Sequence, residues 1–112
     1  MGDEIVIFIT ASSIEEGEKI SRQLIEKKIA ACANISPNLR SIFYWEDKIC
    51  NEEEVLIIVK SRAVFFDQIE KCVKENHSYS VPEIIALPII KGSIEYLDWV
   101  KKSTIESAMS SR

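Results

Sequence analysis

Two long segments rich in β-forming and apolar residues, 31–45 and 48–62, are separated only by Glu46-Asp47. This arrangement predicts a long β-hairpin. Each arm exceeds the usual strand of about five or six residues, and an extended residue adds about 3.3 Å. A hairpin of that length projects beyond the single core that a chain of 112 residues can form. The fold must therefore include a projecting hairpin that something else covers.

The end of the first arm carries the apolar run Ile42-Phe43-Tyr44-Trp45. Neighbouring side chains on a strand point to opposite faces, so this run places large apolar groups on both faces of the hairpin. A monomer of this size can bury only one of those faces. We therefore expect self-association, with Phe43, Tyr44 and Trp45 at the interface.

The rest of the chain predicts one domain over residues 1–112, with an order of strand, helix, strand, strand, helix, strand. That order is typical of the split βαβ arrangement, so the expected fold is a ferredoxin-like α/β sandwich with helices on one sheet face. A third helix is an addition to that fold, and residues 103–112 are expected to fray. The elements beyond the hairpin are a strand at 5–11, a helix after Ser12 and Ser13, a helix at 65–76, a strand at 84–90 and a helix after Ser93.

Charge, hydropathy and cysteine content exclude several classes of protein. The formal net charge is −4 and the pI is about 5.1, so the chain lacks the basic footprint that nucleic-acid binding requires. No apolar run approaches the roughly 20 residues of a membrane span. The three cysteines are odd in number and widely spaced, which argues against a disulfide framework. We expect a soluble cytoplasmic protein.

Five sequence blocks stand out along the chain: Ala30-Ala31-Cys32-Ala33-Asn34-Ile35, Ser41-Ile42-Phe43-Tyr44-Trp45-Glu46-Asp47-Lys48, His77-Ser78-Tyr79-Ser80-Val81-Pro82-Glu83-Ile84, Leu87-Pro88-Ile89 and Tyr96-Leu97-Asp98-Trp99. With these blocks in the same order and spacing, the chain resembles the CutA divalent-cation tolerance proteins over nearly its whole length. The resemblance implies a ferredoxin-like homotrimer, related in fold to PII-type signalling proteins, whose long hairpins pair edge to edge. It also implies a cytoplasmic protein linked to tolerance of copper and other divalent ions, with no enzymatic reaction and no organic cofactor.

His77 and Cys32 are the candidate ligands for Cu(II) or another divalent cation, since imidazole and thiolate both suit copper. Each has an alternative: His77 ends a helix and can interact with its dipole, and Cys32 lies in a small apolar run typical of packing. Some family members carry a cysteine and a second histidine where this chain has Ile9 and Asn76, and Ser78 replaces a typical proline. Those departures put a copper site of that kind in doubt.

Lys60, Tyr79 and Glu83 are the candidate lining of a pocket between subunits, because Tyr79 and Glu83 share one face of an extended segment. The alternative is a hydrogen-bond network at the interface. The run 52–54 of three glutamates can attract cations, but such a run is usually a solvated face, and we interpret it so. Three functions therefore compete: a trimeric metal-tolerance protein, a non-catalytic scaffold or small-ligand sensor, and an enzyme with Cys32 as nucleophile and His77 as base.

Overall fold

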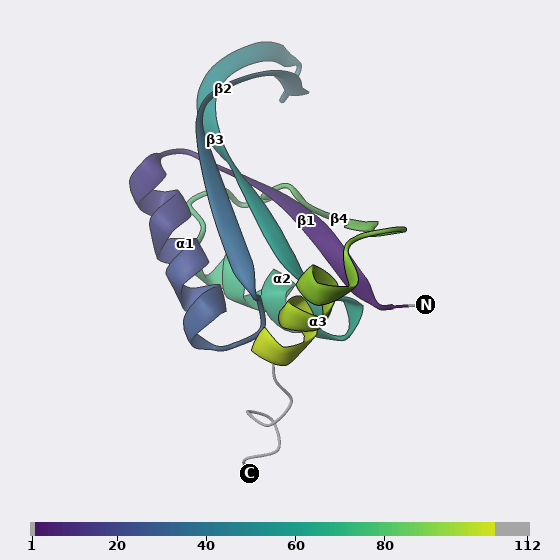
Figure 1. Cartoon of the computed structure of the whole chain (residues 1–112). Coiled ribbons are helices and arrows are strands. Elements are labelled where there is room, and N and C mark those ends of the chain that lie inside the picture. Colours follow the sequence, from purple (N-terminus) through teal and green to yellow (C-terminus); the bar gives the residue numbers. More distant parts are fainter. Residues whose placement is uncertain (1, 105–112) are drawn as a thin grey trace.

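The computed structural model describes residues 2–104, which form a four-stranded antiparallel sheet in the order β2-β3-β1-β4 with two helices packed on one face. This order is that of a ferredoxin-like sandwich and confirms the predicted fold class (Figure 1). The elements are β1 (Glu4–Ala11), α1 (Ile14–Glu26), β2 (Cys32–Trp45), β3 (Lys48–Arg62), α2 (Phe66–Asn76) after a 3₁₀ turn (Ala63–Phe65), β4 (Ile84–Pro88) and α3 (Ile94–Ser103).

The core lies between the sheet and the pair of helices α1 and α2. Alternate residues of β1 and β3 point into it, and the apolar stripes of the two helices cover them, as the spacing of apolar residues in the sequence predicts. Gly17 lets α1 approach β3 closely, because a Cβ at that position would lie 3.3 Å from Val55 Cγ2. The fully buried side chains of this core include Ile7, Ile9, Ile20, Leu24, Ile57, Val59, Ile69 and Val73.

The hairpin of β2 and β3 projects beyond the other strands, as predicted. Strand β1 accompanies β3 only as far as Val55, so residues 48–54 of β3 pair with β2 alone. Glu46 and Asp47 both have positive φ, which is typical of the two-residue turn that joins the strands. An irregularity between Ser36 and Leu39 bends β2, and the hairpin curves over at its end (Figure 1).

Helix α3 lies on the opposite face of the sheet from α1 and α2. Arg62 points to this second face, where its guanidinium donates to the Thr104 hydroxyl and carbonyl oxygens at 3.1 Å each. Ser93 caps α3 by accepting a hydrogen bond from the Tyr96 N–H at 3.2 Å, as expected. The expectation of helices on one face therefore holds for α1 and α2 only, and α3 covers one end of the second face (Figure 1).

Two predicted boundaries concern the end of β4 and the C-terminal residues. Strand β4 ends at Pro88 and not at residue 90, although the Ile89 N–H still donates to the Glu4 carbonyl oxygen at 3.2 Å. Pro88 still pairs with Ile5, and β1 begins at Glu4, so the partner strand ends where β4 ends. The predicted fraying of residues 103–112 falls mostly outside the described residues.

Candidate functional site

His77 ends α2 and is held by main-chain groups at both ring nitrogens. Nε2 donates to the Thr10 carbonyl oxygen at 2.7 Å, and Nδ1 accepts from the Tyr79 N–H at 3.0 Å. The carbonyl can only accept and the amide can only donate, so these two bonds require the tautomer with its proton on Nε2 and the lone pair on Nδ1. Its side chain is fully buried. His77 therefore fastens the segment after α2 to the end of β1 and offers no free nitrogen to a metal ion.

Glu16 makes a second connection at the same junction. Ser13 is the N-cap of α1, with its hydroxyl accepting from the Glu16 N–H at 3.1 Å. The Glu16 carboxylate reaches back to Ser12, whose N–H donates to Oε1 at 2.8 Å, and its other oxygen accepts from the Ser78 N–H at 2.6 Å. Burial raises the pKa of Glu16, but these hydrogen bonds outweigh that effect and lower the pKa to about 2.

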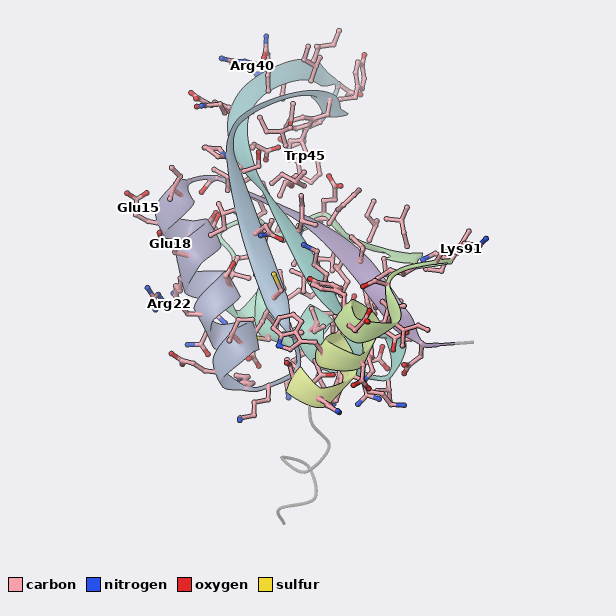
Figure 2. The ribbon with its side chains drawn as sticks, in the orientation of Figure 1. Glu15, Glu18, Arg22, Arg40, Trp45 and Lys91 are labelled. Atoms are coloured by element: carbon pink, nitrogen blue, oxygen red, sulfur yellow. The ribbon has the colours of Figure 1, made fainter. Side chains whose placement is uncertain are left out.

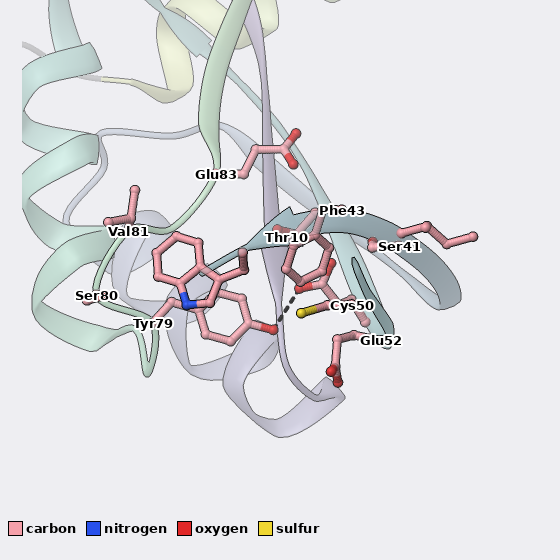
Figure 3. Close-up of a pocket in the computed structure, with 12 residues that line it drawn as sticks. Thr10, Ser41, Phe43, Cys50, Glu52, Tyr79, Ser80, Val81 and Glu83 are labelled. Carbon is pink, nitrogen blue, oxygen red and sulfur yellow. Dashed lines mark hydrogen bonds between the residues drawn. The ribbon is translucent and has the colours of Figure 1, made fainter. Parts of the chain in front are cut away.

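The curved hairpin and residues 79–83 enclose an open cavity of about 700 Å³, called the hairpin cavity below. It lies on the same face of the sheet as α3, in the part of that face that α3 does not cover. Cross-strand pairs Ser41–Glu52 and Phe43–Cys50 face it from the hairpin, while Tyr79 and Glu83 face it from the segment after α2 (Figure 3). Its full lining is Thr10, Ser41, Ile42, Phe43, Trp45, Cys50, Glu52, Glu54, Tyr79, Ser80, Val81 and Glu83.

Tyr79 and Glu54 connect the two walls of the hairpin cavity. The Tyr79 hydroxyl donates to Glu54 Oε2 at 2.6 Å, which is the dashed line in Figure 3. Burial raises the pKa of Tyr79, and the hydrogen bond to Glu54 and its negative charge raise it further, so the hydroxyl stays protonated as a donor. Glu54 is only 5% exposed. The interpretation of residues 52–54 as a solvated face is therefore wrong for Glu54.

Of the proposed pocket residues, Tyr79 and Glu83 line the hairpin cavity and Lys60 does not. Lys60 pairs with Cys32 and donates to Asn34 Oδ1, next to the Cys32 thiol that lies 3.6 Å from the same oxygen. Thr10, whose carbonyl group bonds to His77, pairs with Leu56 of β3. Lys60 lies four residues farther along β3, which is about 13 Å. Cys32 therefore lies beside Lys60, whereas His77 lies beside Thr10. The structure does not bring the two side chains together as a metal site or a thiol–imidazole pair.

The other two cysteines also lie apart from each other. Cys50 faces the hairpin cavity, and Cys72 is buried in the core. Within residues 2–104, no group of three or more His, Cys, Asp or Glu side chains is arranged to hold a metal ion. The predicted interface residues Phe43, Tyr44 and Trp45 are 40%, 70% and 47% exposed in the single chain. Their role in an interface stays a prediction.

Sequence reasoning preferred a solvated face to cation attraction for Glu52 and Glu54, and it did not place Glu16 at the site. One signal was available for the hairpin residues, because residues two apart on a strand share a face. Cys50, Glu52 and Glu54 share a face, so the run of glutamates divides into two that face the cavity and Glu53, which points away. No comparable signal existed for Glu16, whose partner Ser78 is 62 residues away.

Comparison with known proteins identifies the family. Residues 5–103 match the family described as CutA1 divalent ion tolerance protein. The chain belongs to the CutA1 family. A CutA relative from Thermus thermophilus is 43% identical over 101 residues, which cover 90% of this chain and 98% of that protein. A solved structure of the divalent cation tolerance protein Cut A1 from the same organism has a TM-score of 0.88 at 42% identity, covering 90% of this chain and 98% of that one.

A chloroplastic CutA 1 protein from Oryza sativa is 44% identical over 103 residues, or 92% of this chain. The chain spans 58% of the length of that relative and 55% of a chloroplastic CutA from Arabidopsis thaliana. Among residues 2–104 of this CutA1 family member, no helix combines the length and the apolar character needed to cross a membrane.

Proposed function

We propose that this chain acts in tolerance of divalent cations as a homotrimeric, non-catalytic, cytoplasmic protein that binds Cu(II) or related cations weakly in the hairpin cavity. The supporting observation is the charge of that cavity, which three glutamates and one thiol line. None of the described lining residues carries a positive charge. Carboxylate oxygens and a thiol suit divalent cations, and a cavity of one sign of charge concentrates counter-ions.

The binding is proposed to be weak because residues 2–104 of one chain contain no group of three ligand side chains arranged to hold an ion. The proposed site does not include His77, because both of its ring nitrogens bond to the main chain. This differs from the expectation that His77 and Cys32 hold the ion. The cation is cargo in this proposal, and no reaction is assigned to it.

Calorimetry with Cu(II) tests the site. We expect weak, saturable binding to the wild type, a clear loss in Glu83→Gln, and no loss in Cys32→Ser, which alters a thiol outside the cavity. The absence of any saturable heat would contradict cation binding. A loss in Cys32→Ser without a loss in Glu83→Gln would return the site to Cys32.

The homotrimer is proposed from the projecting hairpin. Its outer face exposes Tyr44 and Ile49 at 70% and 73%, and β2 is an edge strand with unpaired main-chain groups. We expect light scattering to give three times the 12.8 kDa mass of one chain. Ile49→Lys on the outer face is expected to weaken the assembly. A monomeric mass for the wild type would contradict the proposal.

A second candidate function is a non-catalytic scaffold or small-ligand sensor with an inter-subunit pocket. The observation that favours it is the size of the hairpin cavity, since about 700 Å³ is room for a small organic molecule and more than one ion requires. Its aromatic lining is also typical of ligand sites. A thermal-shift panel of metabolites and nucleotides tests it, and a flat response to every compound would contradict it.

A further inference from the structure

Aromatic rings form a large part of the hairpin cavity. Phe43 and Trp45 lie on the concave side of the hairpin, and Tyr79 faces them from the segment after α2. Figure 2 shows Trp45 beneath the curved end of the hairpin, and Figure 3 shows Phe43 and Tyr79 in the same cavity. The faces of such rings attract organic cations, and alkyl chains pack against them. This lining suits a ligand that is both cationic and partly apolar.

The polar part of the hairpin cavity is acidic. Glu52, Glu54 and Glu83 contribute three carboxylates from two segments of the chain. Glu54 is 95% buried, and Tyr79 occupies only its Oε2. The carboxylate can accept further hydrogen bonds, and an ammonium group of a ligand would form a charge-assisted pair with it.

We propose that the hairpin cavity binds an aliphatic diamine or polyamine. This inference rests on the second candidate function and names the ligand class of that site. Glu52 and Glu54 are two residues apart on one strand face, or about 7 Å, which is within reach of the two ends of a short diamine. Its ammonium groups pair with the carboxylates, and its methylene chain lies against Phe43, Trp45 and Tyr79.

The same lining opposes anionic ligands. A nucleotide would bring its phosphates to a cavity that three carboxylates line, and like charges in such a place are unfavourable. The volume also exceeds what a single cation fills, so an ion alone would leave the aromatic walls in contact with water. A multiply charged organic cation satisfies both the charge and the volume.

Calorimetry with putrescine and spermidine on the full chain tests the proposal, with 1,4-butanediol as the uncharged analogue and ATP as the anion. We expect saturable binding of both amines, tighter for spermidine, and no heat from butanediol or ATP. In Trp99→Phe, Trp45 is the only tryptophan, and its fluorescence is expected to change on addition of spermidine. Binding without that change would place the amine elsewhere and overturn the proposal.

Glu52→Gln and Glu53→Gln form a matched pair, because the two residues are adjacent in β3 but only Glu52 lines the cavity. Removing one charge-assisted pair is expected to weaken spermidine binding about tenfold in Glu52→Gln, and less than about twofold in Glu53→Gln. Equal weakening in both variants would mean non-specific attraction to surface charge and would overturn the proposal.

The outcome for the amines can be separated from the outcome for the proposed functions. Binding of Cu(II) or of another panel compound without binding of either amine would overturn this inference and leave the corresponding function standing. No binding of any compound would overturn this inference together with both candidate functions.

Discussion

The two halves of β3 lie in opposite environments. Residues 55–62 pair with β1, residues 56–60 also pair with β2, and the helices α1 and α2 bury Val55, Ile57 and Val59 to 4% or less. Residues 48–54 pair with β2 alone, and Ile49 is 73% exposed. The inner half completes its own burial within one chain, whereas the outer half offers apolar and acidic surface to something else. One continuous strand thus has a buried half and a half that is largely exposed in the single chain.

The largest expected effect comes from the inner half. Ile57→Ala removes a fully buried side chain from the core and is expected to lower the free energy of unfolding by about 3 kcal/mol. Ile49→Ala removes the same atoms from the outer half and is the matched control. Urea denaturation at a fixed protein concentration measures both. An equal cost for the two variants would show that the outer half is as fully packed as the inner one in the assembly.

The sequence predicts the inner half well because its signals are local. The strand and helix periodicities, the capping serines Ser13 and Ser93, and the turn at Glu46-Asp47 all depend on residues within a few positions of each other. The projecting hairpin follows from length alone. Even the helix that the minimal fold does not require, α3, is recognisable from its cap and its apolar positions.

The sequence predicts the site poorly because its contacts join distant segments. The orientation of His77 depends on the carbonyl group of Thr10. The environment of Glu54 depends on Tyr79, whose hydroxyl donates to its carboxylate from the segment after α2. A histidine in a family motif suggests a metal ligand until its two partners are known. A run of glutamates suggests a solvated face until the strand is placed beside the segment that covers it.

A smaller effect is expected at the junction that supports the cavity from the inner half. The pKa of Glu16 falls from 4.5 to about 2 on folding, so its stabilising effect is complete above pH 4.5 and is lost as the pH falls towards 2. We expect Glu16→Gln to cost about 2 kcal/mol at neutral pH and to flatten the acid side of the stability profile.

Glu15→Gln is the control for that experiment, since Glu15 is an exposed residue of the same helical turn and is expected to change stability by only a few tenths of a kcal/mol, or about 0.3. Denaturation at several pH values compares the two variants with the wild type. If Glu16→Gln kept the full acid dependence of the wild type, the hydrogen bonds to Ser12 and Ser78 would not be the source of the stabilisation.

The smallest effect is expected at the boundary between the two halves. Tyr79→Phe removes the hydroxyl that donates to Glu54, which leaves a buried carboxylate with one partner fewer and is expected to cost about 1 kcal/mol. Tyr44→Phe is the control, because Tyr44 is 70% exposed on the outer face of the hairpin.

Urea denaturation measures the cost, and Trp45 fluorescence in a Trp99→Phe background reports the cavity wall. Since Tyr79 ties the loop after α2 to the root of the hairpin, Tyr79→Phe is expected to alter that fluorescence while Tyr44→Phe leaves it unchanged. The opposite result would mean that the outer half is positioned by its exposed face, through contacts between chains, and not by the tie to Glu54.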